Sequence, residues 1–68
     1  MEEISKIIVA KRKALGLSME KVARKADVTL KTVINIEKGM GVSSSTLFAV
    51  LSALDLELII KDKEGDNA

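Results

Sequence analysis

Apolar residues recur at helical spacing along most of this chain. Residues 2–15 predict a first helix, because one face collects positions spaced i, i+3 and i+4: Ile4, Ile7, Ile8, Lys11, Ala14 and Leu15. Three shorter helices are predicted over residues 19–26, 30–38 and 46–54. Their inward residues are Val22, Ala23 and Ala26, then Val33 and Ile36, then Leu47, Val50, Leu51 and Leu54.

Residues suited to helix ends lie between these segments. Gly16 and Gly39 follow the first and third helices, where a left-handed residue commonly ends a helix. Ser18 and Thr29 are predicted N-caps of the second and third helices, and Ser44 or Ser45 of the fourth. Asp27 lies in the break between the second and third helices, and Asp tolerates the left-handed conformation better than most residues.

The segment after the fourth helix differs in pattern. Leu56, Leu58 and Ile60 alternate with Glu57, Ile59 and Lys61, which predicts a β-strand over residues 56–61. No other segment of the sequence predicts a strand, so we expect antiparallel pairing with the same strand of a second copy. The predicted dimerisation residues are Leu56, Leu58, Ile59 and Ile60. The alternative is that this segment continues the fourth helix.

Composition narrows the classes of function. The chain has 68 residues, so one small domain is expected, and it contains no cysteine and no histidine. We therefore expect no disulfide, no metal site, no cofactor and no enzymatic activity, because the commonest metal ligands and the commonest general base are missing. No apolar run is long enough to span a bilayer, and the acidic start lacks the basic region of a secretory signal. A cytoplasmic location is expected.

Charge is unevenly distributed along the chain. The net charge is only +1, yet residues 4–38 hold nine bases against three acids, while residues 39–68 carry a net charge of −3. A basic half of this kind indicates a polyanionic partner on one side of the molecule. Solvated helix faces are the alternative. One Phe and no Trp or Tyr leave almost no stacking surface for single-stranded nucleic acid.

Residues 19–37 have the pattern of a helix-turn-helix. The small Ala23 allows the two helices to approach, Asp27 occupies the turn, and three apolar residues hold the helices together: Val28, Val33 and Ile36. A break of three residues between two short helices fits this motif. An ordinary small helical bundle is the alternative.

The same region resembles a known family. Lys11-Arg12-Lys13-Ala14-Leu15-Gly16-Leu17-Ser18, Val22-Ala23, Asp27-Val28-Thr29 and Ile34-Asn35-Ile36-Glu37-Lys38-Gly39 resemble the Xre/Cro-type repressor pattern. Gly41-Val42-Ser43, Thr46-Leu47 and residues 50–58 are similar to HipB-type antitoxins, which are DNA-binding dimers with C-terminal strands that pair between subunits. The resemblance covers about residues 4–61 and implies a mainly α, lambda-repressor-like bundle of about four helices.

The resemblance also implies residue roles. It places the third helix in the major groove and matches Thr29, Leu30, Lys31 and Asn35 to positions that face DNA. Ile34 lies beside this face, and Ser18 and Lys25 complete the set of predicted DNA contacts. Asn35 can pair with adenine in a bidentate manner, and Lys31 can reach guanine or a phosphate. Leu30 and Ile34 are apolar and weaken readout by hydrogen bonds. Arg12 and Glu37 match a buried ion pair of the family; two separately solvated charges are the alternative.

These observations predict a transcriptional repressor that binds a palindromic DNA operator as a homodimer. The resemblance implies that it is also the antitoxin of a HipA-type serine/threonine kinase toxin. The alternatives are a regulator without a toxin partner and a helical protein-interaction module without DNA binding. Residues 1–55 form the predicted DNA-binding domain, residues 56–61 the dimerisation strand and residues 62–68 a flexible tail.

Overall fold

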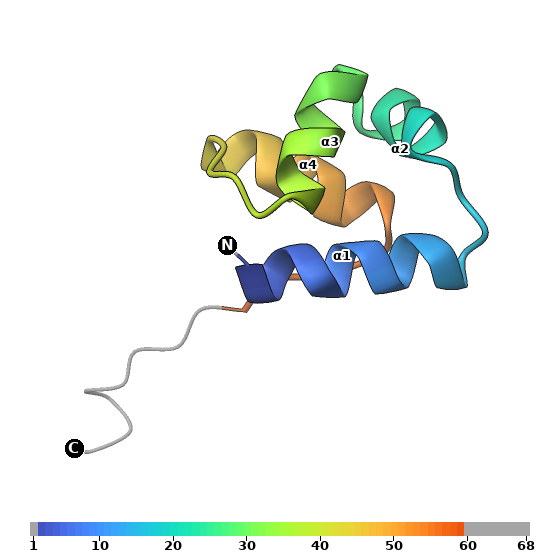
Figure 1. The fold of residues 1–68 in the computed structure, drawn as a ribbon, viewed down its shortest axis with the longest axis horizontal. Coiled ribbons are helices and arrows are strands. Elements are labelled where there is room, and N and C mark those ends of the chain that lie inside the picture. The colour runs from blue at the N-terminus through green and yellow to red at the C-terminus, as the bar shows by residue number, and fades with distance from the viewer. Residues whose placement is uncertain (1, 60–68) are drawn as a thin grey trace, which may run out of the picture.

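The computed structural model describes residues 2–59 and contains four helices in that range, with no strand (Figure 1). They are α1 (Glu2–Ala14), α2 (Met19–Ala26), α3 (Leu30–Glu37) and α4 (Ser44–Ala53). The predicted mainly helical class and the four predicted helices are confirmed. Within residues 2–59, no helix combines the length and the apolar character that a membrane crossing requires.

The helices enclose one apolar core. α2 packs against both α3 and α4, and α1 packs against α3, which is steeply inclined to both α1 and α4 in Figure 1. Every helix contributes buried side chains to the core: Ile8, Val22, Ala23, Val33, Ile36, Leu47, Val50, Leu51 and Leu54. The inward residues predicted for α3 and α4 are confirmed in full. In α2, Val22 and Ala23 are buried and Ala26 packs against the core from a partly buried position.

Three helices begin with a side-chain cap. The hydroxyls of Ser18 and Thr29 accept hydrogen bonds from backbone N–H groups in the first turns of α2 and α3, as predicted. The predicted cap of α4 at Ser44 or Ser45 is wrong, because Ser43 accepts from the Thr46 N–H at 3.3 Å. Val42 packs against the core directly before it, so the chain turns into the helix at the first serine of the run.

All four helices end in the same way. Each is followed by a residue with positive φ, namely Gly16, Asp27, Gly39 and Asp55. The N–H of the next residue then bonds to a carbonyl five residues back, as in Val28 N–H to Ala23 O at 3.0 Å and Leu56 N–H to Leu51 O at 2.8 Å. The N–H of the positive-φ residue itself bonds to a carbonyl three residues back, as in Asp27 N–H to Arg24 O at 3.3 Å. Together the two bonds satisfy carbonyls that the helix leaves free, and the left-handed residue reverses the chain.

The orientation of α1 about its own axis differs from the prediction. Ser5 and Ile8 are its buried residues, whereas Ile7 is 55% exposed and Leu15 is 41% exposed. The Ser5 hydroxyl donates to the Glu2 carbonyl at 2.7 Å, so its burial leaves no donor unpaired. A Cβ at Gly39 would lie 3.7 Å from that hydroxyl oxygen. A small side chain at position 5 therefore allows the α3–α4 loop to pack on α1, which turns Ile7 outward.

The predicted strand over residues 56–61 is not formed in its described part, residues 56–59. Residues 56–59 have no regular secondary structure, and Ile60 and Lys61 lie outside the described residues, as does the predicted tail over 62–68. A strand requires a neighbour for its backbone N–H and C=O groups, and residues 2–59 offer none. Continuation of α4 is also wrong, because Asp55 has a φ of 57° and ends the helix. Leu56 packs against the core.

Candidate nucleic-acid interface

The exposed side of α3 is formed by residues on the arc opposite its buried face. Val33 and Ile36 are fully buried, and a helix turns by about 100° per residue. Lys31 therefore lies almost directly opposite the core. Leu30 and Ile34 lie on one flank of this outward arc, and Asn35 lies on the other. The fold thus brings four of the predicted contact residues onto one side of one helix.

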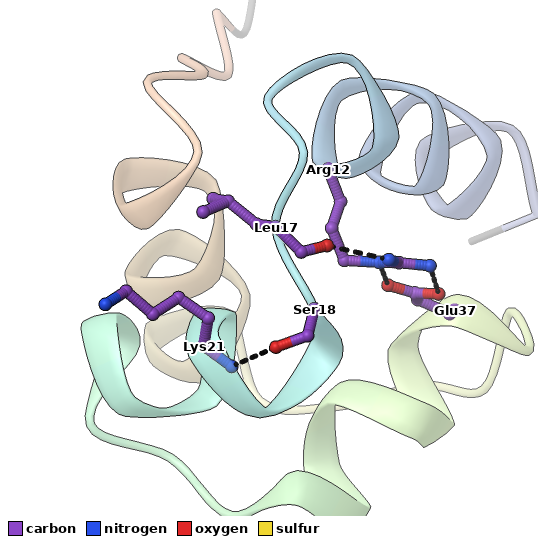
Figure 2. Close-up of polar contacts among 5 residues, drawn as sticks. All are labelled: Arg12, Leu17, Ser18, Lys21 and Glu37. Atoms are coloured by element: carbon purple, nitrogen blue, oxygen red, sulfur yellow. Dashed lines mark hydrogen bonds and ion pairs between the residues drawn. The ribbon is translucent and has the colours of Figure 1, made fainter.

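Thr29 orients the start of this arc. Its hydroxyl oxygen accepts from the Thr32 N–H at 3.2 Å and lies 2.8 Å from the Thr32 hydroxyl. These contacts make the Thr29 hydroxyl the cap of α3, and its role as a DNA contact stays a prediction. Ser18 has the matching role in α2, where its hydroxyl oxygen accepts from the Lys21 N–H at 3.0 Å (Figure 2). Both helices therefore start at a fixed position with their remaining N–H groups at the surface.

Asn35 uses its backbone and its side chain differently. Its carbonyl accepts hydrogen bonds from the Lys38 and Met40 N–H groups, at 3.2 and 3.0 Å, and so ends the helix. Within residues 2–59 its side-chain amide has no hydrogen-bond partner, and no side-chain nitrogen or oxygen is both buried and unpaired. Asn35 is half-buried, and its unpaired amide atoms retain contact with solvent, where they can meet an external donor and acceptor.

An ion pair fixes α3 against α1. The Arg12 guanidinium donates through Nε to Glu37 Oε2 at 2.6 Å and through a terminal nitrogen to Glu37 Oε1 at 3.1 Å (Figure 2). Its other terminal nitrogen donates to the Leu17 carbonyl at 2.9 Å. The two side chains are 14% and 11% exposed, so the pair is largely shielded from water. Arg12 thereby joins α1, the α1–α2 loop and the end of α3.

The ion pair also determines the charge of the α3 surface. Glu37 is the only acid in α3, and Arg12 neutralises it. Lys31 and Lys38 are exposed at this helix, so its outward side is positive. The exposed bases of α2 are Lys21, Arg24 and Lys25, with Glu20 in the first turn. The α3–α4 loop contributes no base between Met40 and Ser43.

The predicted contact residues divide between two helices. Thr29, Leu30, Lys31, Ile34 and Asn35 belong to α3 and its cap, whereas Ser18 caps α2 and Lys25 lies in the last turn of α2. A contact surface that joins both helices stays a prediction.

Two hydrogen-bond partners, Thr32 for Thr29 and Leu17 for Arg12, were not predicted from the sequence. Thr32 carried no signal beyond a hydroxyl at capping distance, and the Leu17 contact uses a backbone carbonyl, which no side-chain pattern can indicate.

Comparison with known proteins places this geometry in context. The model of a helix-turn-helix family of the Xre/Cro type matches residues 8–60, a range that contains α2, α3, α4 and most of α1. A comparison with curated proteins gave no match.

Proposed function

Because this chain belongs to the Xre/Cro-like helix-turn-helix family of DNA-binding regulators, we propose that it is a transcriptional repressor that acts as a homodimer on a palindromic operator. The observation that carries the proposal is the outward arc of α3, which is free of unpaired acid and presents Lys31 and the open amide of Asn35. α3 lies in the major groove in this proposal. The role places the protein in the cytoplasm with its operator.

The α3 side chains divide the work of base recognition. Asn35 donates and accepts in the bidentate pair that an adenine offers in the major groove. Lys31, at the centre of the arc, reaches guanine or a phosphate through a long side chain. A free amide and a cation on one helix face are the groups that such base contacts require.

Phosphate contacts come from the helix starts and from α2. The first-turn N–H groups of an α-helix are directed along its axis toward the N-terminal end, and the caps at Ser18 and Thr29 hold these ends of α2 and α3 in place. Backbone N–H groups at a helix start favour an anion such as a phosphate. Lys25, exposed in the last turn of α2, adds a cation without a base contact.

Selection of operators from random duplexes tests the proposal. A repressor enriches a palindrome whose half-sites lie about 34 Å apart. Asn35→Ala is expected to weaken binding to the selected site by about 1–3 kcal/mol and to relax preference at one base pair in each half-site. An Asn35→Ala protein with the site and affinity of the wild type would remove Asn35 from base recognition.

Lys25→Ala is the matched control, since it removes a charge but no base contact. We expect this variant to bind all duplexes more weakly by the same factor and to lower the slope of log affinity against log salt by about one. A change in the selected sequence would instead make Lys25 a base-contacting residue.

Dimerisation through residues 56–61 completes the proposed function. Leu58 and Ile59 are 40% and 71% exposed, and the backbone groups of residues 57–59 have no hydrogen-bond partner within residues 2–59. Pairing with the same segment of a second copy satisfies those groups and covers the apolar side chains. A two-fold axis through such a strand pair gives the two α3 helices the symmetry of a palindrome.

Leu58→Pro and Leu58→Ala separate strand pairing from side-chain burial. Proline removes a ladder donor, so it is expected to convert the dimer to monomer in sedimentation, whereas alanine keeps the donor and weakens the dimer less. A Leu58→Pro protein that sediments as the wild-type dimer would place the dimer contact elsewhere.

The similarity of residues 41–58 to HipB-type antitoxins supports a second partner, a HipA-type serine/threonine kinase toxin. Expression with the product of the neighbouring gene tests this: a stable complex that suppresses kinase toxicity supports the antitoxin role. A neighbour unrelated to kinases supports a regulator without a toxin. Failure of the wild type to select any sequence at low salt would favour the interaction module.

A further inference from the structure

We propose that Leu30 contacts the C5-methyl group of thymine in the major groove, which makes this apolar side chain a specificity-determining residue. The inference rests on the proposed function and names the base that one residue of α3 recognises.

Leu30 has no role in the core of this fold. It is the first residue of α3 and 38% exposed, whereas Val33 and Ile36 of the same helix are fully buried. Neither Leu30 nor Ile34 belongs to the core, and neither is among the partly buried apolar side chains that pack against it. Packing in the core therefore does not explain the apolar character of the exposed Leu30, and the half-buried Ile34 lies outside the core as well.

The two side chains form one apolar strip on the outward arc. Residues at i and i+4 of a helix are neighbours, so Leu30 and Ile34 lie one above the other. Lys31 borders this strip at the centre of the arc, and Asn35 lies on the far flank. The Thr29 cap holds the first turn, which presents Leu30 at the leading end of the helix. One side of α3 thus offers apolar contact and the other offers hydrogen bonds.

Charge favours DNA as the occupant of this strip. Glu37, the only acid in α3, is held by Arg12, and Lys31 of the helix and Lys38 at its C-cap are exposed. An apolar strip beside cations fits a partner surface that carries negative charges along its edges and an apolar group between them. The major groove has this character, because phosphates line its edges.

The chemistry of the groove then selects the base. Every base edge in the major groove presents donors or acceptors, and among the four bases only thymine adds a methyl group. A leucine pressed against a cytosine N4 or a guanine O6 would leave that polar group without a partner, which is unfavourable. Against the thymine methyl it buries apolar surface instead. Leu30 therefore favours thymine and disfavours cytosine at the base pair it covers.

Deoxyuridine substitution tests the contact without changing the protein. The operator is first selected with the wild type, and each thymine is then replaced in turn by deoxyuridine, which lacks only the methyl group. At one symmetric position we expect a loss of about fourfold in affinity for each methyl removed, the factor that corresponds to burial of one methyl-sized group. Replacing that thymine by cytosine weakens binding further, and 5-methylcytosine at the same position regains the factor.

Leu30→Ala and Ile34→Ala assign the effect to one side chain. Leu30→Ala is expected to bind the thymine and deoxyuridine operators equally, while Ile34→Ala keeps the difference. Circular dichroism checks the fold of both variants, and the exposure of Leu30 predicts little change. If Ile34→Ala alone removes the methyl effect, the assignment to Leu30 is overturned.

The outcomes separate this inference from the proposed function. A wild type that selects a palindrome but binds every deoxyuridine operator as tightly as the thymine operator overturns the methyl contact and leaves the repressor intact. A wild type that selects no sequence overturns the repressor, and the apolar strip then belongs to a protein partner. A wild type with one methyl-sensitive position that depends on Leu30 supports both.

Discussion

The α2–α3 pair and α1 are both regular helical segments, but local sequence signals determined them to different degrees. In α2 and α3 the caps at Ser18 and Thr29 and the left-handed Asp27 occur where the sequence predicts them. In α1 the helix is present, yet Ile7 is exposed and Ser5 is buried. Both helices carry apolar residues on more than one side, since Leu30 and Ile34 lie on the outward arc of α3. They differ because the helix-turn-helix pattern assigns Val33 and Ile36 of α3 to the core, whereas no neighbouring motif assigns one face of α1 to it.

The comparison shows that periodicity fixes the element but not its rotation when several faces are apolar. For α1, the rotation depends on the residues that pack against it. Arg12 holds one end to Glu37 and Leu17, and the α3–α4 loop rests near Ser5 at the other. These contacts select the face of Ser5, Ile8 and Arg12 over the face that carries Ile7.

Alanine substitution at the adjacent Ile7 and Ile8 is expected to give the largest difference in stability between two variants. Ile8→Ala opens a cavity at a fully buried position and should lower the free energy of unfolding by about 3–4 kcal/mol. Ile7→Ala should lower it by less than about 0.5 kcal/mol, because its side chain is mostly in water. Urea unfolding of both variants measures the difference. If the Ile8→Ala protein does not fold, Ile8→Val is compared with Ile7→Ala instead, and it should lower the free energy of unfolding by about 1 kcal/mol. Equal losses would return α1 to the predicted rotation.

Loss of the ion pair is the next largest effect. Arg12→Ala leaves the Glu37 carboxylate shielded without its cation and frees the Leu17 carbonyl. We expect a loss of about 3 kcal/mol, the lower end for a broken buried pair, because both side chains retain some exposure. Lys13→Ala, one residue along α1, is expected to cost about 0.5 kcal/mol. Melting curves of the two variants that coincide would show that the pair does not hold α3 in place.

Substitutions of the adjacent Ser43 and Ser44 test where α4 begins, and the expected change in stability is smaller than for the ion pair. Ser43→Ala removes the hydroxyl that accepts from the Thr46 N–H and is expected to lower stability by about 1 kcal/mol. For a domain of this size that corresponds to a fall of about 4–8 °C in melting temperature. Ser44→Ala lies inside the helix and should change the melting temperature little. The opposite order would move the cap back to Ser44.

The helix end between α2 and α3 gives the smallest effect and the only expected gain. Asp27 has a φ of 57°, a conformation that costs an L-residue energy and costs glycine none. Asp27→Gly should raise stability by about 0.5 kcal/mol, net of the added freedom of glycine in the unfolded chain. Gly16→Ala, at a φ of 69° with open space around it, is the converse control and should destabilise. A destabilised Asp27→Gly would show that the Asp side chain supports the turn.

Asp27 and Asp55 show when a left-handed Asp at a helix end can be predicted from the sequence. Both residues have a φ of 57° and both end a helix in the same hydrogen-bond pattern. Asp27 was predictable because a second helix with its own cap follows directly. Asp55 was followed by a β-favouring run, so the sequence predicted a strand without showing how α4 stops.

Local sequence patterns were enough to predict the four helices, two of their three side-chain caps, the buried residues of α3 and α4, and the residues that the outward arc of α3 presents. These features depend on residue type and helical period, which act over a few neighbouring residues. Tertiary structure decided the rotation of α1, the joining of Arg12 to the Leu17 carbonyl, and the choice of Ser43 as the cap. Each of these depends on contacts between segments distant in the chain or on where the core anchors a loop, and no local pattern encodes them. Residues 56–59 differ again, because strand pairing needs a neighbouring backbone that residues 2–59 do not supply.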